Sequence, residues 1–320
     1  MRAELRTAIR VILFAVLAYA AIYWLRRSWD DVRRTAIDLR PSWSGILLAS
    51  LCVCAGYAAL IATWRRLLII WRSPIDTLAA TRIWFVSSLG KYIPGKIWSI
   101  GAMAILAREA GASAIAATGS SIIMTIVNIA AGFAVVALAG AGELLAAYPV
   151  FRIAAWVTLV ATAIGLAFGP RLLTWAVRTV TRLIGRPMPE MPTLTRGTLL
   201  FIFGANCAAW IAYGVGFGIF WSSLLGHGGG VSLAALAVYT ASYLLGYLVL
   251  VAPGGLGVRE TALIGLLTTL QLATPADAVL LATTSRIWLT VLEIVPGLIL
   301  LPGASLRRRT SISPPDGPAA

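Results

Sequence analysis

The sequence predicts an all-α fold, a polytopic membrane helix bundle, and three observations support it. Of the 320 residues, 59% are hydrophobic and only 12% are charged, whereas a soluble domain carries about 25% charged residues. The mean hydropathy is +0.88, and apolar runs long enough to span a bilayer alternate with short Arg-rich loops. Two apolar stretches are interrupted by Pro and Gly, which predicts re-entrant or broken helices within the bundle.

The predicted membrane crossings follow from the apolar runs, taken in order. The first run, residues 11–25, follows Arg2, Arg6 and Arg10 and is expected to remain as an uncleaved anchor. We expect about eight crossings, because a membrane helix needs about 20 apolar residues and basic loops favour the cytoplasmic side. The expected crossings are residues 11–25, 43–63, 114–139, 153–168, 198–225, 233–251, 259–272 and 279–301.

Residues 73–112 form the first interrupted stretch. Its centre contains helix-breaking residues flanked by two cations: Gly90, Lys91, Pro94, Gly95 and Lys96. Neither half of the stretch reaches the length of a membrane span. We therefore predict a helix–break–helix hairpin that enters the bilayer and returns to the same side.

Residues 251–260, VAPGGLGVRE, form the second interrupted stretch. Its helix-breaking residues are Pro253, Gly254, Gly255 and Gly257. Arg259 and Glu260 follow and precede a further apolar run. Broken backbone persists in hydrocarbon only where protein or a wet cavity satisfies its polar groups, and charges at membrane depth indicate a functional site. The alternative is a loop at the membrane surface, with Arg259 at the level of the lipid phosphates.

Two predicted crossings are similar in sequence, which indicates a two-fold internal repeat. Residues 118–132, TGSSIIMTIVNIAAG, and residues 283–297, TTSRIWLTVLEIVPG, share six identities at an offset of 165. Polar residues spaced 3-4-3 share one face of each helix: Thr118, Ser121, Thr125 and Asn128 in the first, and Thr283, Arg286, Thr290 and Glu293 in the second. Interrupted segments at matching places in two halves point to a transporter's substrate site, although Ser and Thr also serve simply to join helices.

The basic loops predict that the N- and C-termini are cytoplasmic. The linker at residues 171–196 carries five Arg and is expected to lie on the cytoplasmic leaflet as an amphipathic segment, or to be a plain solvated loop. In this topology the loop at residues 26–40 lies on the external side of the membrane although it also carries five Arg. This placement disagrees with the preference of basic loops for the cytoplasmic side. We expect one integral membrane domain, residues 1–306, and a basic, Pro-rich, disordered tail, residues 307–320.

The segment APGGLGVRE, the upstream segment GKYIPGKIW and the span between them resemble the transmembrane region of lysylphosphatidylglycerol synthases, a flippase-like family of bacterial and archaeal membrane proteins. The resemblance covers residues 9–301. It implies a multi-pass protein of the bacterial inner membrane that moves a lipid between leaflets. Some members also carry a cytoplasmic synthase domain; we expect none in this chain, and therefore no synthase activity. The first motif is richer in Lys and lacks the family's Gly-Arg pair.

We therefore expect translocation of a phospholipid or a lipid-linked glycan through a polar cavity lined by the broken helices. The residues expected to hold the headgroup are Lys91, Lys96, Asn128, Arg259, Glu260, Arg286 and Glu293. Arg suits a phosphate through its planar fork, so lipids with anionic headgroups are the expected partners. Glu260 is expected to pair with Arg286, and Arg259 with Glu293, because an unpaired buried charge is costly.

Residues for catalysis or metal binding are not evident. His227 is the only histidine, in a Gly-rich turn, and the three cysteines lie inside apolar runs without metal-ligand spacing. We expect no catalytic residue, cofactor or metal, and we attribute the net charge of +14 to orientation and anionic lipids rather than nucleic acid. The alternatives are a membrane-embedded transferase or an accessory subunit in glycolipid, hopanoid or aminoacyl-lipid metabolism, with pathway enzymes or a second copy of the chain as partners.

Overall fold

The structure, a computed structural model, describes residues 41–92, 97–140, 144, 146, 148–184, 194–226, 228–249 and 253–301. In these ranges the regular elements are all helices, which confirms the predicted all-α fold for this part of the chain. Several features predicted from the sequence lie outside the described residues: the crossing at 11–25, the loop at 26–40, residues 185–193 of the linker, the tail, His227, Pro94, Gly95 and Lys96.

Within the described ranges, five helices are long and apolar enough to cross a membrane. They are α2 (Trp43–Ile70), α5 (Ala114–Ala139), α7 (Pro149–Ile184), α8 (Arg196–Leu225) and α11 (Pro275–Leu300). The shortest have 26 residues, or about 39 Å, which exceeds the roughly 30 Å of a hydrocarbon core. The side chains of Ser42, Ser113, Thr195 and Thr274 cap the N-termini of α2, α5, α8 and α11.

The first interrupted stretch forms a hairpin of α3 (Thr77–Ser88), η1 (Leu89–Tyr92) and α4 (Ile97–Glu109). The arms have 12 and 13 residues, about 18 and 20 Å, too short to cross. The backbone N–H of Ser113 donates to Ser73 Oγ at 3.3 Å, so the two ends of the hairpin meet. The predicted helix–break–helix hairpin is confirmed, and Gly90 lies in its turn.

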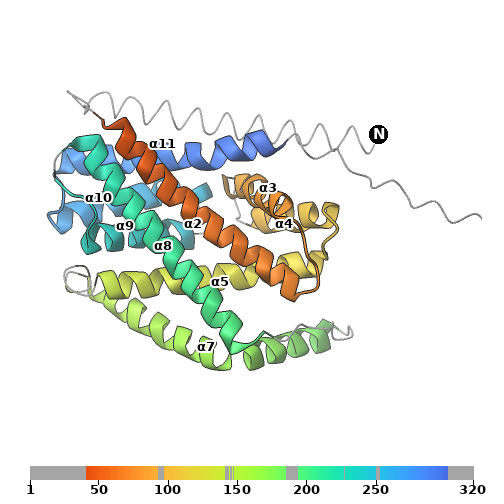
Figure 1. Cartoon of the computed structure of the whole chain (residues 1–320). Coiled ribbons are helices and arrows are strands. Elements are labelled where there is room, and N and C mark those ends of the chain that lie inside the picture. The colour runs from red at the N-terminus through yellow and green to blue at the C-terminus, as the bar shows by residue number, and fades with distance from the viewer. Residues whose placement is uncertain are drawn as a thin grey trace, which may run out of the picture.

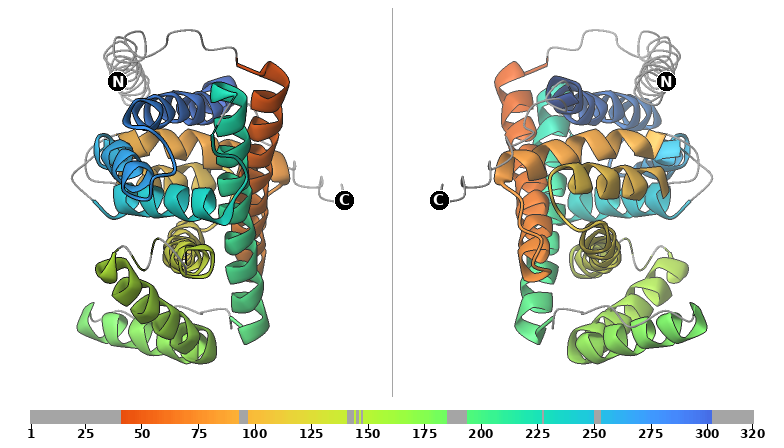
Figure 2. Two further views of the ribbon diagram at one scale, coloured as in Figure 1. Left: turned by 90° about the vertical axis from the view of Figure 1, so that its left-hand side faces the viewer. Right: turned by 90° about the vertical axis from the view of Figure 1, so that its right-hand side faces the viewer.

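The second interrupted stretch is also a hairpin, formed by α9 (Leu233–Leu248), η2 (Pro253–Gly255) and α10 (Val258–Thr269). The prediction of two separate crossings here was therefore wrong. The arms have 16 and 12 residues, about 24 and 18 Å, and they lie side by side (Figures 1 and 2). Gly254, Gly255 and Gly257 have φ of 57°, 72° and 81°, backbone angles that reverse the chain and that other residues resist.

The order of elements repeats, which supports the predicted two-fold internal repeat. The series α2, α3, η1, α4, α5 is followed later by α8, α9, η2, α10, α11. The two halves run in opposite directions: Ser42, before α2, donates to the carbonyl of Ser223 near the end of α8. Arg66, near the end of α2, lies over the ring of Phe201 near the start of α8. Figure 1 also shows α5 and α11 running in opposite directions.

The helices stack in layers, with the two hairpins in the middle. Figure 2 shows α11 on one side of the hairpins and α5 on the other, while α2 and α8 pass along one edge. Because the halves are inverted, the hairpins enter this middle layer from opposite ends of the bundle, and η1 contacts η2. The α2–α8 pair packs closely, since a Cβ on Gly216 would lie 3.0 Å from the carbonyl oxygen of Ala49.

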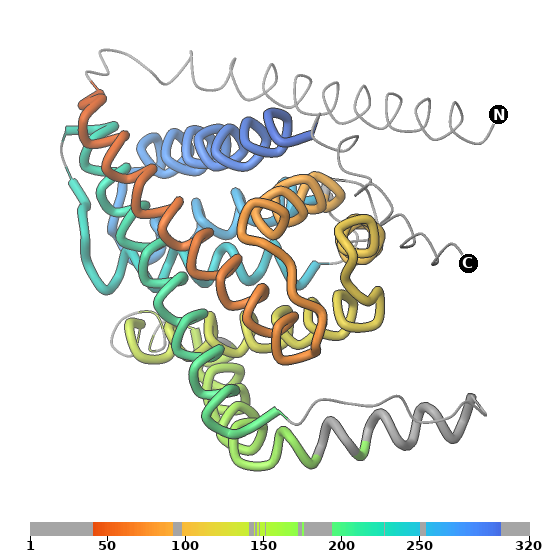
Figure 3. Tube along the Cα trace, turned by 45° about the vertical axis from the view of Figure 1, so that its right-hand side comes forward, coloured from red at the N-terminus to blue at the C-terminus, as the bar shows by residue number. Residues whose placement is uncertain are grey.

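Helix α7 lies at the outside of the stack, against α5 and α8 (Figures 2 and 3). It extends to Ile184 with Pro170 inside it. The first part of the predicted linker at 171–196 is thus a continuation of the membrane helix rather than a separate segment. Trp175 on this extension is exposed.

Candidate functional site

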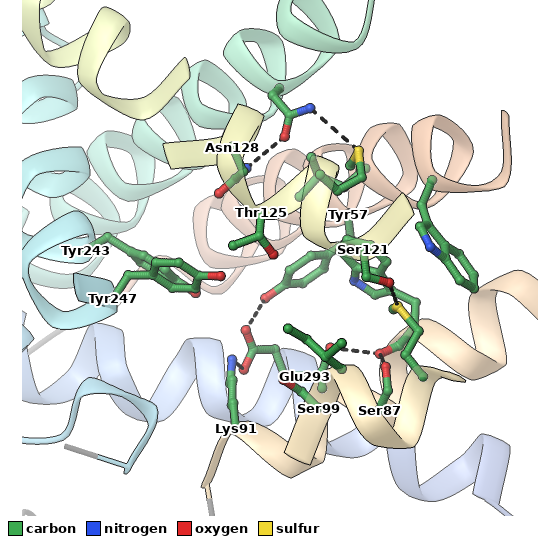
Figure 4. A pocket seen from close by; sticks show the side chains of 18 of the residues that line it. Tyr57, Ser87, Lys91, Ser99, Ser121, Thr125, Asn128, Tyr243, Tyr247 and Glu293 are labelled. Carbon is green, nitrogen blue, oxygen red and sulfur yellow. Dashed lines mark hydrogen bonds and ion pairs between the residues drawn. The ribbon is translucent and has the colours of Figure 1, made fainter. Parts of the chain in front are cut away.

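A cavity of about 210 Å³ lies where the first hairpin meets α2, α5, α8, α9 and α11 (Figure 4). Its lining combines aromatic, hydroxyl, amide and charged groups. We call the seven aromatic side chains of its described lining the aromatic wall: Tyr57, Trp64, Trp84, Trp210, Tyr213, Tyr243 and Tyr247. A cavity with apolar walls and a few placed polar groups is the usual form of a small-ligand site.

The charged part of the cavity is an ion pair between Lys91 and Glu293. Lys91 lies in η1, at the tip of the first hairpin, and Glu293 lies on α11. The hydroxyl of Tyr57 on α2 donates to Glu293 Oε1 at 3.0 Å, as Figure 4 shows. The carboxylate is thus held from two sides, which offsets part of the cost of burying it.

A second charged contact lies next to the tip of the other hairpin. Arg286 on α11 donates from Nη2 to the carbonyl of Gly254 at 2.7 Å. Its Nε lies 3.4 Å from Glu260 Oε1, an ion pair without hydrogen-bond geometry. Glu260 Oε2 also accepts from the backbone N–H of Gly257 at 2.7 Å, which caps α10. Arg286 therefore ties η2 and the start of α10 to α11.

One helix thus holds the tips of both hairpins. Glu293 binds the first tip through Lys91, and Arg286 binds the second through Gly254 and Glu260. The two residues are seven positions apart, about 10 Å along α11, so each contact forms separately. We refer to these contacts as the Glu293 latch and the Arg286 latch.

The structure brings one of the two predicted charge pairs together and not the other. The pairing of Glu260 with Arg286 is confirmed. The pairing of Arg259 with Glu293 was wrong, because Glu293 pairs with Lys91. The reversal at η2 places α10 against α9, so Arg259 is buried over the rings of Tyr239 and Tyr243, at 5.2 and 4.4 Å. These are cation–π contacts with α9 rather than ionic contacts with α11.

Part of the polar face of α5 lines the cavity, and one of its residues also joins helices. Ser121, Thr125 and Asn128 line the cavity. Asn128 also joins helices. Its side-chain Nδ2 donates to Asn206 Oδ1 at 2.9 Å, and its backbone carbonyl accepts from Trp210 Nε1 at 2.9 Å. These bonds fix α5 to α8 and set the position of the Asn128 side chain at the cavity.

Of the predicted headgroup residues, Lys91, Asn128 and Glu293 line the cavity. Arg286 and Glu260 lie at the Arg286 latch, and Arg259 lies against α9. The aromatic wall and Asn206, which is fully buried, were not predicted from the sequence. A lone amide in the middle of an apolar run is itself a signal of a polar site, and Asn206 could have been found in this way. The aromatic rings carried no such signal, because aromatic residues are common in any membrane helix.

Among the described residues, no group of three or more His, Cys, Asp or Glu side chains could hold a metal ion. Comparison of the chain with known protein families, curated proteins and solved structures finds no match.

Proposed function

We propose that this membrane protein moves a lipid between the two leaflets and holds the lipid's headgroup in the cavity beside the Glu293 latch. The observation that carries the proposal is that two hairpins from inverted halves meet at a cavity that contains a few placed polar groups, and that both hairpins are tied to one helix. Inverted repeats with discontinuous helices are typical of transporters, whose substrate sites lie where the broken segments meet.

The geometry suggests how such a protein works. Lipid translocation needs a polar path for the headgroup, while the acyl chains remain in the hydrocarbon. Breaking the Glu293 latch frees the tip of the first hairpin, and breaking the Arg286 latch frees the tip of the second. Because the hairpins come from opposite ends of the bundle, each release opens the cavity toward a different side. Lipid binding drives this change only if it favours one of the two states.

The sequence motifs complete the proposal. The resemblance to flippase-like proteins suggests a bacterial inner membrane. With residues 11–25 as a further crossing and both hairpins re-entrant, the chain crosses six times, so both termini lie on one side. The basic N-terminal and C-terminal segments favour the cytoplasmic side.

A lipid-scrambling assay tests the proposal. The purified protein is placed in liposomes that contain a fluorescent phospholipid or a fluorescent glycolipid, and an impermeant reductant bleaches the outer leaflet. We expect bleaching of more than half of the label with at least one of the two lipids. A Lys91→Met/Glu293→Gln variant, which removes both charges of the latch together, is the matched control and should lose this activity. Bleaching equal to that of protein-free liposomes with both lipids would refute translocation.

A further inference from the structure

We propose that the cavity recognises an uncharged, polyhydroxylated headgroup, that is, a glycosyl group, rather than a phosphate. This inference rests on the proposed function and narrows it to one class of lipid. Three properties of the cavity support it: its charge balance, its aromatic wall and its hydrogen-bonding groups.

Among the described residues that line the cavity, the charges cancel. The charged side chains of this lining are Lys91 and Glu293, and they form an ion pair. The two arginines that the sequence suggested for phosphate binding have other partners. Arg286 contacts Glu260 and the carbonyl of Gly254. Arg259 lies over two tyrosine rings. A phosphate would have to displace Glu293 from Lys91 and leave a buried carboxylate without its cation, which is strongly unfavourable. A neutral headgroup leaves the pair intact.

The aromatic wall places rings from α2, α3, α8 and α9 around the cavity. Ring faces carry negative charge and ring edges positive charge. The C–H bonds of a sugar ring are weakly positive, so a pyranose packs its apolar face on such rings, whereas a phosphate gains nothing from them. Figure 4 shows Tyr243 and Tyr247 together at one edge of the cavity, with their hydroxyls pointing inward.

The hydrogen-bonding groups of the cavity match hydroxyls, which both donate and accept. Asn128, Thr125 and Ser99 contribute amide and hydroxyl groups to the lining. Two lining groups, Trp64 Nε1 and the Tyr213 hydroxyl, are buried without a hydrogen-bond partner among the described residues. A buried donor without a partner is costly, and a ligand hydroxyl that reaches it recovers that cost.

A pair of short-chain ligands tests the inference directly. The protein in phosphatidylcholine nanodiscs is titrated with hexyl glucoside and, separately, with hexyl phosphate, and heats are corrected with empty nanodiscs. Both ligands have the same alkyl chain, so the difference reports the headgroup. We expect saturable binding of hexyl glucoside at least tenfold tighter than that of hexyl phosphate. Equal or tighter binding of the phosphate, or no saturable binding of the glucoside, would overturn the proposal.

Variants of Tyr247 place the binding in the cavity. Its side chain is partly exposed, 37% for the residue, so its replacement leaves the packed core intact. Tyr247→Leu should weaken hexyl glucoside binding at least fivefold, whereas Tyr247→Phe keeps the ring and should weaken it less than threefold. Tyr148→Leu, which is not part of the lining, is the control and should not change it. Unchanged binding in Tyr247→Leu would contradict the proposed site.

The outcomes separate this inference from the proposed function. Scrambling of the fluorescent phospholipid together with tight hexyl phosphate binding would overturn the glycosyl headgroup but keep lipid translocation. Scrambling of neither lipid would refute translocation, whatever the binding data show.

Discussion

At the scale of single residues, the site depends on how buried charges are compensated. Arg286 and Glu293 are 6% and 8% exposed, yet both lie inside an apolar helix. Each has a partner from a hairpin, and each partner lies at or beside a backbone break. A buried charge is tolerated only with such a partner, so the Glu293 latch and the Arg286 latch stabilise the folded protein. They are also the contacts that we propose to break during translocation.

We predict that Arg286→Ala destabilises the protein by about 3 kcal/mol, because it leaves the partly buried Glu260 without a cation and the carbonyl of Gly254 without a donor. Arg286→Ala/Glu260→Ala should recover at least half of that loss, since the stranded carboxylate is gone. Thermal unfolding in detergent measures both effects. Arg152→Ala, at an exposed position on α7, is the control and should be neutral. If the double variant were less stable than Arg286→Ala, the pair would not be the cause.

Part of this residue-level picture was predictable. Glu260 and Arg286 have opposite signs and lie in consecutive apolar segments, which favoured their pairing. The partner of Glu293 did not follow, because Lys91 lies 202 positions away in the other half and no sequence pattern relates the two. Arg259 was assigned to an ion pair because a sequence shows charge but not the tyrosine faces that the fold places beside it.

At the scale of elements, the two hairpins show why apolar length alone misjudges a crossing. The run at residues 233–251 is as apolar as a membrane span, but α9 ends at Leu248 and the chain turns back at η2. The turn depends on close backbone contact: a Cβ on Gly255 would lie 2.7 Å from the carbonyl oxygen of Gly246. The first hairpin was predicted correctly because neither of its halves had the length of a span.

We predict that Gly255→Ala destabilises the protein by roughly 1–3 kcal/mol, since alanine is strained at φ 72° and would also clash with the backbone of α9. Gly265→Ala is a matched control on the neighbouring helix α10, where a Cβ meets nothing within 4 Å. This control should be neutral or slightly stabilising, because alanine favours a helix. Thermal unfolding of the two variants side by side measures the difference. Equal midpoints would show that the turn at η2 does not require glycine.

At the scale of the whole molecule, the inverted repeat explains why the sequence could predict two halves but not their relation. Helix α5 begins at Ala114 and α11 at Pro275, an offset of 161, whereas the sequence match used 165. The difference of four residues is about one helical turn. The matched polar residues of α5 and α11 therefore lie on the same face of their helices, but about one turn apart in their distance from the start of the helix. An inverted pair shares element order and hydropathy, and neither pattern shows in which direction a helix runs.

The final prediction concerns alternating access and uses Thr125, which lines the cavity from α5. In a background with Cys52, Cys54 and Cys207 replaced by Ala, Thr125→Cys is labelled with an impermeant thiol reagent added to one side of the membrane or to the other. With Glu293→Gln, the first hairpin loses its latch, so labelling should rise from the side on which Ser73 and Ser113 meet. With Arg286→Gln, the second hairpin is released and labelling should rise from the opposite side. We expect each variant to raise the labelling rate on its own side at least fivefold, because each removes the ionic contact of one tip alone. An increase on the same side in both variants would show that the two latches do not gate opposite entrances.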